Sequence, residues 1–423
     1  MHNNNRYDLT NRLIHFYRPI NQEIDGCFYI PEYFGWSDIY EDGKMSALFL
    51  LRASIRHSML VPTWSIRGGK RTIYGPFPAC CFTEMPLPAF IETALARQSR
   101  SEKISPYALS FKKKDLFKLG ARPAIYGLTS NSISYPNGEN GQERLFEETI
   151  LPKQEQYRFI TYNLTEEGKN VDWTHEREWR LPYTNLIVLK KTNEELNEYG
   201  IISELRDIPK FDLSDGILSD IGVIVQKSSD VKKILYDILC LIYRKKINKN
   251  KYSFIIDISK IHDVEKIRSS EDERQLLANS MIKIDDFLEP NSDIATSFLE
   301  QIRSFEEEIE QKSNNEKISG KPSCWLWFYD IFDNKVRSLL NQKKAFVNEQ
   351  NKILLKTERL NLDVHLNLQE NKIERLASKI EQKFGIKCGY FSKLPTSSDI
   401  APYFNSQNQG DFDRIYYNYS CDA

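Results

Sequence analysis

The chain has 423 residues, of which 40% are hydrophobic and 28% charged, which predicts two or three domains with packed cores and argues against disorder throughout. Its net charge of -1 carries no overall signature of nucleic-acid or anionic-membrane binding, although a local basic patch is compatible with it. The apolar run 47–51 is too short to span a bilayer, and the first residues lack a signal peptide's apolar segment, so we expect a cytoplasmic protein without a membrane partner.

Short strand-like runs dominate the first part of the chain, up to about residue 190. They are residues 13–16, 79–82, 107–111, 123–126 and 178–181, separated by turns rich in Gly, Pro and Asn. Residues 112–119 predict a short helix that Gly120 ends. Residues 222–225, 230–243 and 252–258 then predict a strand, a helix and a strand. We expect this pattern to form a first α+β domain over residues 1–265.

The character of the sequence changes after residue 265. Charged residues and helical spacing, with the stripe Phe298 to Ile309, predict a helical linker over 266–320. Residues 321–423 predict a small α+β domain of unknown role. Its elements are an apolar strand at 324–328, an amphipathic helix at 371–384 that Gly385 ends, and a strand at 386–391.

The segment 172–180 is the clearest candidate for a functional site, because five of its nine residues are charged and two tryptophans lie among them. If residues 177–181 form a strand, Glu176, Glu178 and Arg180 share an accessible face and Trp179 faces the core. Two carboxylates raise each other's pKa and a nearby arginine lowers it, which is typical of acid–base or cation-stabilising sites. The alternative is a structural Glu–Arg pair across a sheet.

Two further segments are candidates for ligand binding. The Gly68-Gly69 turn lies between Arg67, Lys70 and Arg71, and such a turn can hold a phosphate through backbone N–H groups and charge; it can equally be a solvated hairpin. His15, on the first predicted strand, can hydrogen-bond a ribose or a carboxamide, or can be a satisfied core histidine.

The seven cysteines are scattered and form no C-x-x-C pair, so neither a disulfide framework nor a zinc site is expected. Cys80 and Cys81 are interpreted as structural, because no base for a thiol nucleophile is apparent. No H-E-x-x-H motif or compact His/Asp/Cys cluster exists, and we therefore predict no metal.

Several of these segments together resemble the AbiGi-type abortive phage-resistance family over about residues 13–182. The resemblance lies in the opening strand 13–16, in Cys-Phe-Thr-Glu-Met-Pro-Leu at 81–87, in the strand–helix–strand pattern 107–126, and in Glu-Arg-Glu-Trp-Arg at 176–180. A more distant similarity is to ADP-ribosyltransferases of the DarT type. It implies an N-terminal split β-sheet with flanking helices that binds NAD as substrate. The usual Ser-Thr-Ser middle strand is absent, and residues 81–84 take its place.

The resemblance implies roles for individual residues. His15 and Glu178 stand at the family's early and late catalytic positions, with Glu176 two residues before Glu178. In this reading Arg67 or Arg71 neutralises the pyrophosphate, and Tyr17, Tyr107 or Trp173 stacks on nicotinamide or adenine. We further predict that Thr83 joins His15, Tyr107 and Glu178 in one cleft.

Two functional hypotheses follow from these observations. In the first, the chain is a toxin-like effector of antiviral defence, an ADP-ribosyltransferase or NAD-consuming glycohydrolase that acts on a nucleic-acid or protein target. In the second, it is a non-enzymatic sensor or antitoxin-like immunity module that binds a partner toxin, antitoxin or sensor subunit. A third class, a nucleic-acid-processing enzyme, is disfavoured, because no metal-binding carboxylate cluster is apparent.

Overall fold

The computed structural model describes residues 10–21, 29–31, 34, 44–67, 70–100, 102, 104–127, 144–162, 172–202, 207–262, 270–289, 291–312, 324–360, 362, 364–393 and 403–405. The chain divides into two compact units. The first comprises Met1–Ile234, Lys249–Lys283 and Asp422–Ala423, and the second comprises Leu235–Asn248 and Ile284–Cys421. Both units mix helices with strands, as the α+β prediction requires.

The first unit is built on a large mixed sheet with the strand order β16-β15-β14-β8-β1-β7-β12-β9. In that order, the strands are Met281–Lys283, Tyr252–Asp257, Ile221–Val225, Ala108–Lys112, Arg12–Phe16, Ala79–Thr83, Glu178–Pro182 and Arg122–Pro123. β14 and β15 are parallel and are joined through α6 (Ser228–Tyr243), so the predicted strand–helix–strand unit is confirmed.

One junction in this sheet is much weaker than its neighbours. β1 pairs with β8 over five residues, and β7 pairs with β12 over five residues. Between β1 and β7, however, only Ile14 and Thr83 are in register. The two halves of the sheet therefore separate beyond this position, and backbone groups of β1 and β7 need other partners there.

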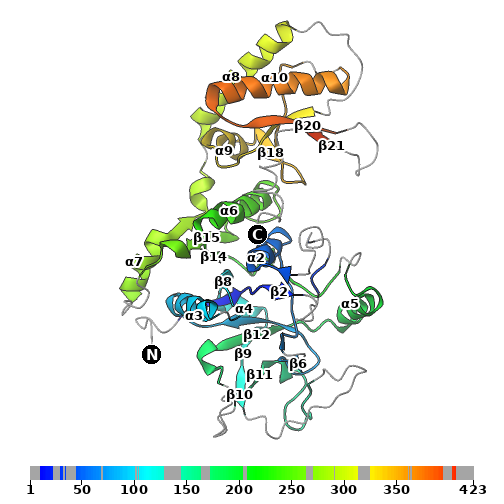
Figure 1. The fold of residues 1–423 in the computed structure, drawn as a ribbon, viewed down its shortest axis with the longest axis vertical. Coiled ribbons are helices and arrows are strands. Elements are labelled where there is room, and N and C mark those ends of the chain that lie inside the picture. The colour runs from blue at the N-terminus through cyan, green and yellow to red at the C-terminus, as the bar shows by residue number, and fades with distance from the viewer. Residues whose placement is uncertain are drawn as a thin grey trace. The chain divides into compact units, whose positions relative to one another are not determined.

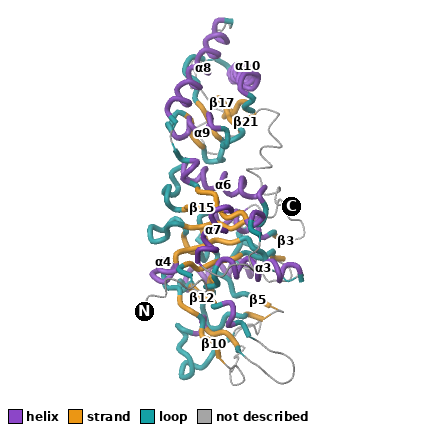
Figure 2. Tube along the Cα trace, turned by 90° about the vertical axis from the view of Figure 1, so that its left-hand side faces the viewer, coloured by secondary structure: helices purple, strands orange, loops and turns teal. Residues whose placement is uncertain are grey.

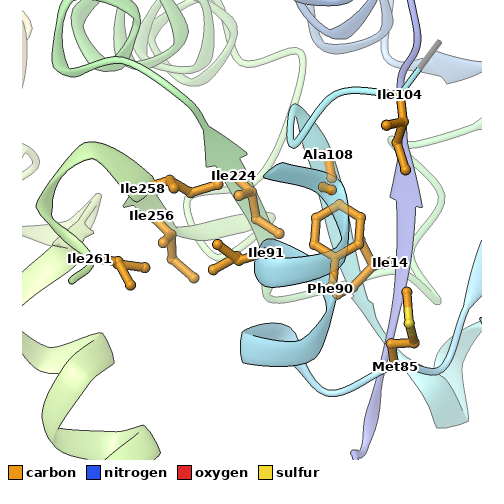
Figure 3. Packing of buried hydrophobic residues seen from close by; sticks show 11 residues of the cluster. Ile14, Met85, Phe90, Ile91, Ile104, Ala108, Ile224, Ile256, Ile258 and Ile261 are labelled. Atoms are coloured by element: carbon orange, nitrogen blue, oxygen red, sulfur yellow. The ribbon is translucent and has the colours of Figure 1, made fainter. Parts of the chain in front are cut away.

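A hydrophobic cluster covers one face of the sheet around this junction. Ile14 of β1 and Ile224 of β14 pack against Phe90 and Ile91 of α3 (Leu87–Ser99), as Figure 3 shows. Each of these four side chains is at most 2% exposed. Burying a large aliphatic or aromatic side chain contributes about 1.5–3 kcal/mol, so α3 is held firmly to this face.

The remaining helices of the first unit are α2 (Ala47–Arg56), α4 (Lys113–Lys118), α5 (Leu186–Tyr199) and α7 (Ser270–Ser280), labelled in Figure 1. α2 begins where the Ser46 hydroxyl accepts the Phe49 N–H, and α5 begins where the Asn185 side chain accepts two N–H groups. Of the helices of this unit, α4 was predicted from the sequence, whereas α2, α3 and α5 were not.

Short two-stranded ladders complete the first unit. They are β2 (Ile20–Asn21) with β3 (Lys44–Met45), β4 (Met59–Leu60) with β13 (Phe211–Asp212), β5 (Ile66–Arg67) with β6 (Lys70–Arg71), and β10 (Ile125–Gly127) with β11 (Phe159–Thr161). The β5–β6 pair makes the predicted Gly-Gly turn a hairpin, although Gly68 and Gly69 themselves lie outside the described residues.

The second unit has a sheet of order β18-β19-β17-β20-β21, with strands Ala345–Val347, Ile353–Leu355, Cys324–Phe328, Cys388–Lys393 and Tyr403–Asn405. Three helices accompany it: α8 (Ser292–Gln311), α9 (Asn334–Asn341) and α10 (Leu366–Phe384). Figure 2 shows α8 and α10 beside strands of this sheet. Gly385 ends α10 in the left-handed conformation, with φ of 69°, as predicted.

The division into units differs from the predicted boundaries. The proposed linker 266–320 does not form one segment, because α7 belongs to the first unit and α8 to the second. The apolar stripe of α8, including Phe298 and Ile302, is buried, which explains its helical spacing as a core face. Residues 313–323, which include the end of the proposed linker, and the end of the chain after residue 405 lie outside the described residues.

None of the helices in the described part of the chain combines the length and apolar composition needed to cross a bilayer.

Candidate functional site

A cavity of about 500 Å³ opens in the first unit where β1 and β7 stop pairing. Both strands contribute to its wall, including His15, Phe16 and Tyr17 from the β1 side and residues 80–83 from β7. Its volume is in the range typical of small-molecule sites. The break in the sheet therefore creates an internal space lined by strand residues from several distant parts of the sequence.

The cavity reaches both faces of the sheet. Neighbouring residues on a strand point to opposite faces, and both Cys80 and Cys81 line the cavity. Arg180 is opposite Cys81 in the β12–β7 register and therefore shares its face. Leu181 is opposite Cys80, on the other face.

The face with Cys81 carries a tightly bonded glutamate. Glu178 accepts a hydrogen bond from Nε of Arg180 at 2.7 Å, and its backbone N–H donates to the Tyr126 hydroxyl at 3.0 Å. Arg180 is only 3% exposed and also donates to the backbone oxygens of Tyr157 and Phe159. Burial alone would lower the pKa of Arg180, but the Glu178 carboxylate raises it, so the guanidinium stays charged.

Cys81 lies beside this pair as a protonated thiol, which is a poor nucleophile. Burial raises its pKa well above the usual range, and the neighbouring Glu178 carboxylate, to which the thiol donates, raises it further. The structural interpretation of Cys81 agrees with this chemistry, although its place in the cavity wall was not anticipated. Glu178 is thus held by both a cationic and a neutral donor, which fixes the orientation of its carboxylate group.

Glu176 also lines the cavity, but it is not part of the strand. It ends the 3₁₀ turn η3 (Thr174–Glu176), and Arg177 then adopts φ of 47° before β12 begins. Burial raises the pKa of Glu176, the Glu178 carboxylate raises it further, and the ion pair with Arg97 at 3.0 Å opposes both effects. Glu176 is therefore a stronger base than an exposed glutamate.

Thr83 and Trp173 occupy neighbouring parts of the wall. The Thr83 hydroxyl donates to the backbone oxygen of Glu176 and accepts the Met85 N–H, so it holds the turn before β12. Trp173 is 38% exposed, and the Arg97 guanidinium lies 5.8 Å from its ring centroid. An exposed indole at the wall of a cavity can stack on a planar ligand.

His15 lies on the opposite face of the sheet from Glu178. Ile14 and Glu178 are both opposite Thr83, so they share a face, and His15 points away from it. The His15 ring contacts Phe82 and Tyr17, and its Nδ1 lies 2.8 Å from the Cys81 backbone oxygen. Because that oxygen can only accept, Nδ1 carries the proton and Nε2 is left unprotonated in the neutral ring. Burial lowers the pKa of His15, which favours this neutral form.

The predicted residues therefore converge only in part. The cavity wall includes six of them: His15, Tyr17, Thr83, Trp173, Glu176 and Glu178. Tyr107 is not in the wall, because its hydroxyl donates to Asp230 at 2.6 Å and the ring is buried elsewhere in the core. The side chain of Arg67 lies outside the described residues.

Arg71 does not line the cavity either, and its guanidinium stacks on Trp64, 3.9 Å from the ring centroid. The arginines that do line it are Arg18, Arg144 and Arg180. Arg144 reaches the wall by donating to the Arg71 backbone oxygen and stacking on Tyr74. No local pattern marks Arg144, because it is positioned by residues about 70 positions away in the sequence.

In the described part of the chain, no three His, Cys, Asp or Glu side chains are grouped so that they could hold a metal ion. Comparison with known proteins adds a match only outside this site. Residues 291–419 match DUF4427, a family described as a protein of unknown function, and this range lies wholly within the second unit. No curated protein and no solved structure significantly matches the chain.

Proposed function

We propose that the chain is an ADP-ribosyltransferase-like effector of phage defence that binds NAD in the cavity between β1 and β7. The observation that carries the proposal is the opening in the sheet, which brings an early strand histidine, His15, and a late strand glutamate, Glu178, into one cavity wall. A space of about 500 Å³ is large enough for most of a dinucleotide. The AbiGi-like motifs at 81–87 and 176–180 both lie at this opening.

In the proposed reaction, the bond between ribose C1′ and the pyridine nitrogen of NAD breaks. The electron pair leaves with nicotinamide and neutralises the positive charge of its ring, and C1′ becomes cationic. Glu178 stabilises that cation, because its partner Arg180 holds the carboxylate in a fixed orientation. A hydroxyl or amine of the target then bonds to C1′ and gives up its proton, and Glu176 is the base for this proton.

Other residues of the wall have supporting roles in this proposal. Arg18 and Arg144 supply positive charge for the pyrophosphate, the role that the family resemblance assigns to Arg67 or Arg71. Trp173 offers a stacking surface for a base. If water takes the place of the target, the same chemistry gives an NAD glycohydrolase.

A second candidate function is the non-enzymatic immunity module, and the Glu178–Arg180 pair itself favours it. Arg180 is almost fully buried and donates to two backbone oxygens besides Glu178. Such a pair also has a purely structural use, since removal of one partner leaves the other buried and unpaired. In that case the chain acts by binding a partner and leaves NAD intact.

The test uses purified full-length protein, NAD labelled in its adenylate phosphate, and cell lysate. The first candidate predicts nicotinamide release and label transfer, and Glu178→Gln lowers the rate about 10²–10³-fold, or about 3–4 kcal/mol in the barrier. Glu84→Gln is the matched control, because Glu84 bonds Lys113 and Trp179 on the other side of β12 and does not line the cavity.

The two candidates predict different results when wild-type and Glu178→Gln protein are compared. Under both candidates, glutamine at position 178 leaves the buried Arg180 without its counter-ion, which should cost up to about 3–5 kcal/mol of folding free energy, so the assays are run below the melting temperature of the variant. An enzyme then loses nicotinamide release in folded Glu178→Gln protein, whereas a non-enzymatic module releases no nicotinamide in either the wild type or the variant. Wild-type protein that releases no nicotinamide under any condition removes the enzymatic proposal.

A further inference from the structure

The two faces that the cavity joins differ in chemistry. Glu178, Arg180 and Cys81 give one face a carboxylate and a guanidinium. The other face carries Tyr17 and His15, and Ser54 of α2 also lines the cavity. The apolar side chains of Leu50 and Ala53 of α2 and of Val61, which follows β4, line it as well. A ligand that crosses the opening therefore meets the Glu178–Arg180 ion pair on one face and the hydroxyls of Tyr17 and Ser54 beyond the other.

The hydroxyl of Tyr17 is the unusual group on the neutral side. Tyr17 is only 7% exposed, it lines the cavity, and its Oη atom is buried without a hydrogen-bond partner. The Ser54 hydroxyl lies close enough to lower the pKa of Tyr17 but does not meet it with hydrogen-bond geometry. Burial dominates and raises that pKa, so the phenol stays protonated.

An unsatisfied buried hydroxyl costs about 1–3 kcal/mol, so its persistence beside a cavity needs a reason. A phenol and a serine hydroxyl can each donate one hydrogen bond and accept others. Their best complement is a neutral group that both donates and accepts, which is the chemistry of a carboxamide. The apolar neighbours Leu50, Ala53 and Val61 suit the flat ring that would carry such a group.

We propose that Tyr17 and Ser54 form a subsite for the uncharged carboxamide of the substrate's leaving base. This inference rests on the proposed function, and it adds the part of the substrate that the neutral face selects. Tyr17 is then a positioning residue: it orients the leaving ring so that the ribose lies at the opening toward Glu178. It takes no part in bond breaking.

Binding of two fragments to the full-length chain tests this subsite without any need for turnover. Nicotinamide carries the amide and pyridine lacks it, and both are titrated by NMR. We expect wild-type protein to bind nicotinamide at least about tenfold more tightly than pyridine, which is the effect of one good hydrogen bond. Tyr17→Phe should abolish this preference and leave pyridine binding unchanged.

Tyr107→Phe is the matched control, because its hydroxyl has a partner, Asp230, and does not line the cavity. It should lower the melting temperature and keep the preference for nicotinamide. Tyr17→Phe should melt at the wild-type temperature or above, since it removes an unsatisfied group.

Three results overturn the inference: no preference for nicotinamide in wild-type protein, an unchanged preference in Tyr17→Phe, or a loss of stability in Tyr17→Phe equal to that in Tyr107→Phe. The last would mean that a bound water already satisfies the hydroxyl. If the protein binds nicotinamide selectively but does not cleave NAD, the proposed reaction is wrong and the subsite stands. If it cleaves NAD but Tyr17→Phe does not change fragment binding, the reaction stands and the subsite is wrong.

Discussion

Glu178 in the first unit and Glu306 in the second are both shielded from solvent, and their surroundings differ in a way that separates function from structure. Glu306, on α8, is 1% exposed, and one of its oxygens accepts the backbone N–H groups of Glu358 and Arg359. Glu178 accepts from a guanidinium and lines a cavity. A buried carboxylate that only completes backbone bonds is a structural group, whereas one held beside open space can meet a ligand.

The largest effect on stability is expected from removing the positively charged partner of Glu178. Arg180→Met keeps most of the apolar stem and removes the charged donor that Glu178 and two backbone oxygens share. We expect a loss of about 3–5 kcal/mol in the free energy of unfolding, measured by urea denaturation.

Arg122→Met is the matched control for this change. Arg122 is opposite Arg180 in the β12–β9 register, and it donates only to the backbone oxygens of Phe117 and Ala121 near the surface. Its loss should cost about 1 kcal/mol or less. Equal losses of unfolding free energy in the two variants would show that burial does not determine how much the Glu178–Arg180 pair contributes to stability.

The strands around the cavity were predictable because their apolar residues recur with a period of two or form short continuous runs. This places Glu178 and Arg180 on one face of β12, as observed. Trp179 does lie on the other face, but it is only partly buried, and its indole N–H donates to Glu84. Glu176 departs from the prediction because Arg177 breaks the strand with a positive φ.

The features missed from the sequence depend on contacts between distant segments. Nine of the ten residues of α2, from Ala47 to Ile55, are buried, and they include the polar Arg52 and Ser54, so the polar residues of this helix do not mark a face turned to solvent. Tyr107 looked available for a ligand, but Asp230, 123 positions away, takes its hydroxyl. His15 and Glu178 were expected to line one cleft, and they do line one cavity, but only the strand register shows that they reach it from opposite faces of the sheet.

The second prediction tests the structural carboxylate. Glu306→Met keeps a side chain of similar length and removes both acceptor oxygens, so the N–H groups of Glu358 and Arg359 lose their partner. We expect a loss of about 2 kcal/mol in the unfolding free energy and unchanged fragment binding to the cavity. Glu306→Gln, which keeps one acceptor oxygen, should recover much of the loss. Impaired nicotinamide binding in Glu306→Met would contradict the division of roles.

A third prediction uses pH to test the neutral face of the cavity. The pKa of His15 is lowered by burial, so protonation is easier in the unfolded chain than in the folded one. The contribution of neutral His15 to stability should therefore be present above its ordinary pKa of about 6.5 and should decline as the pH falls through that value toward the lowered one. His15→Gln, which keeps a donor for the Cys81 backbone oxygen, should remove this component from the difference between melts at pH 7 and pH 5. A wild-type protein that gains stability relative to His15→Gln on acidification would contradict the burial of the imidazole.

The smallest effect is expected from an exposed carboxylate in the same part of the second unit as Glu306. Glu358 is 49% exposed in its side chain and pairs with Arg303 of α8, one turn before Glu306 on the helix. Water screens this pair on one side, and holding two long side chains together costs entropy, so its net contribution should be about 0–1 kcal/mol. Glu358→Gln should therefore change the urea midpoint little, and the small change should shrink further in 1 M salt, where the Debye length is about 3 Å. Glu306→Gln measured beside it keeps the same chemical change and differs chiefly in burial. A loss for Glu358→Gln as large as that for Arg180→Met would mean that charge pairing, and not burial, sets the cost of removing a carboxylate partner in this chain.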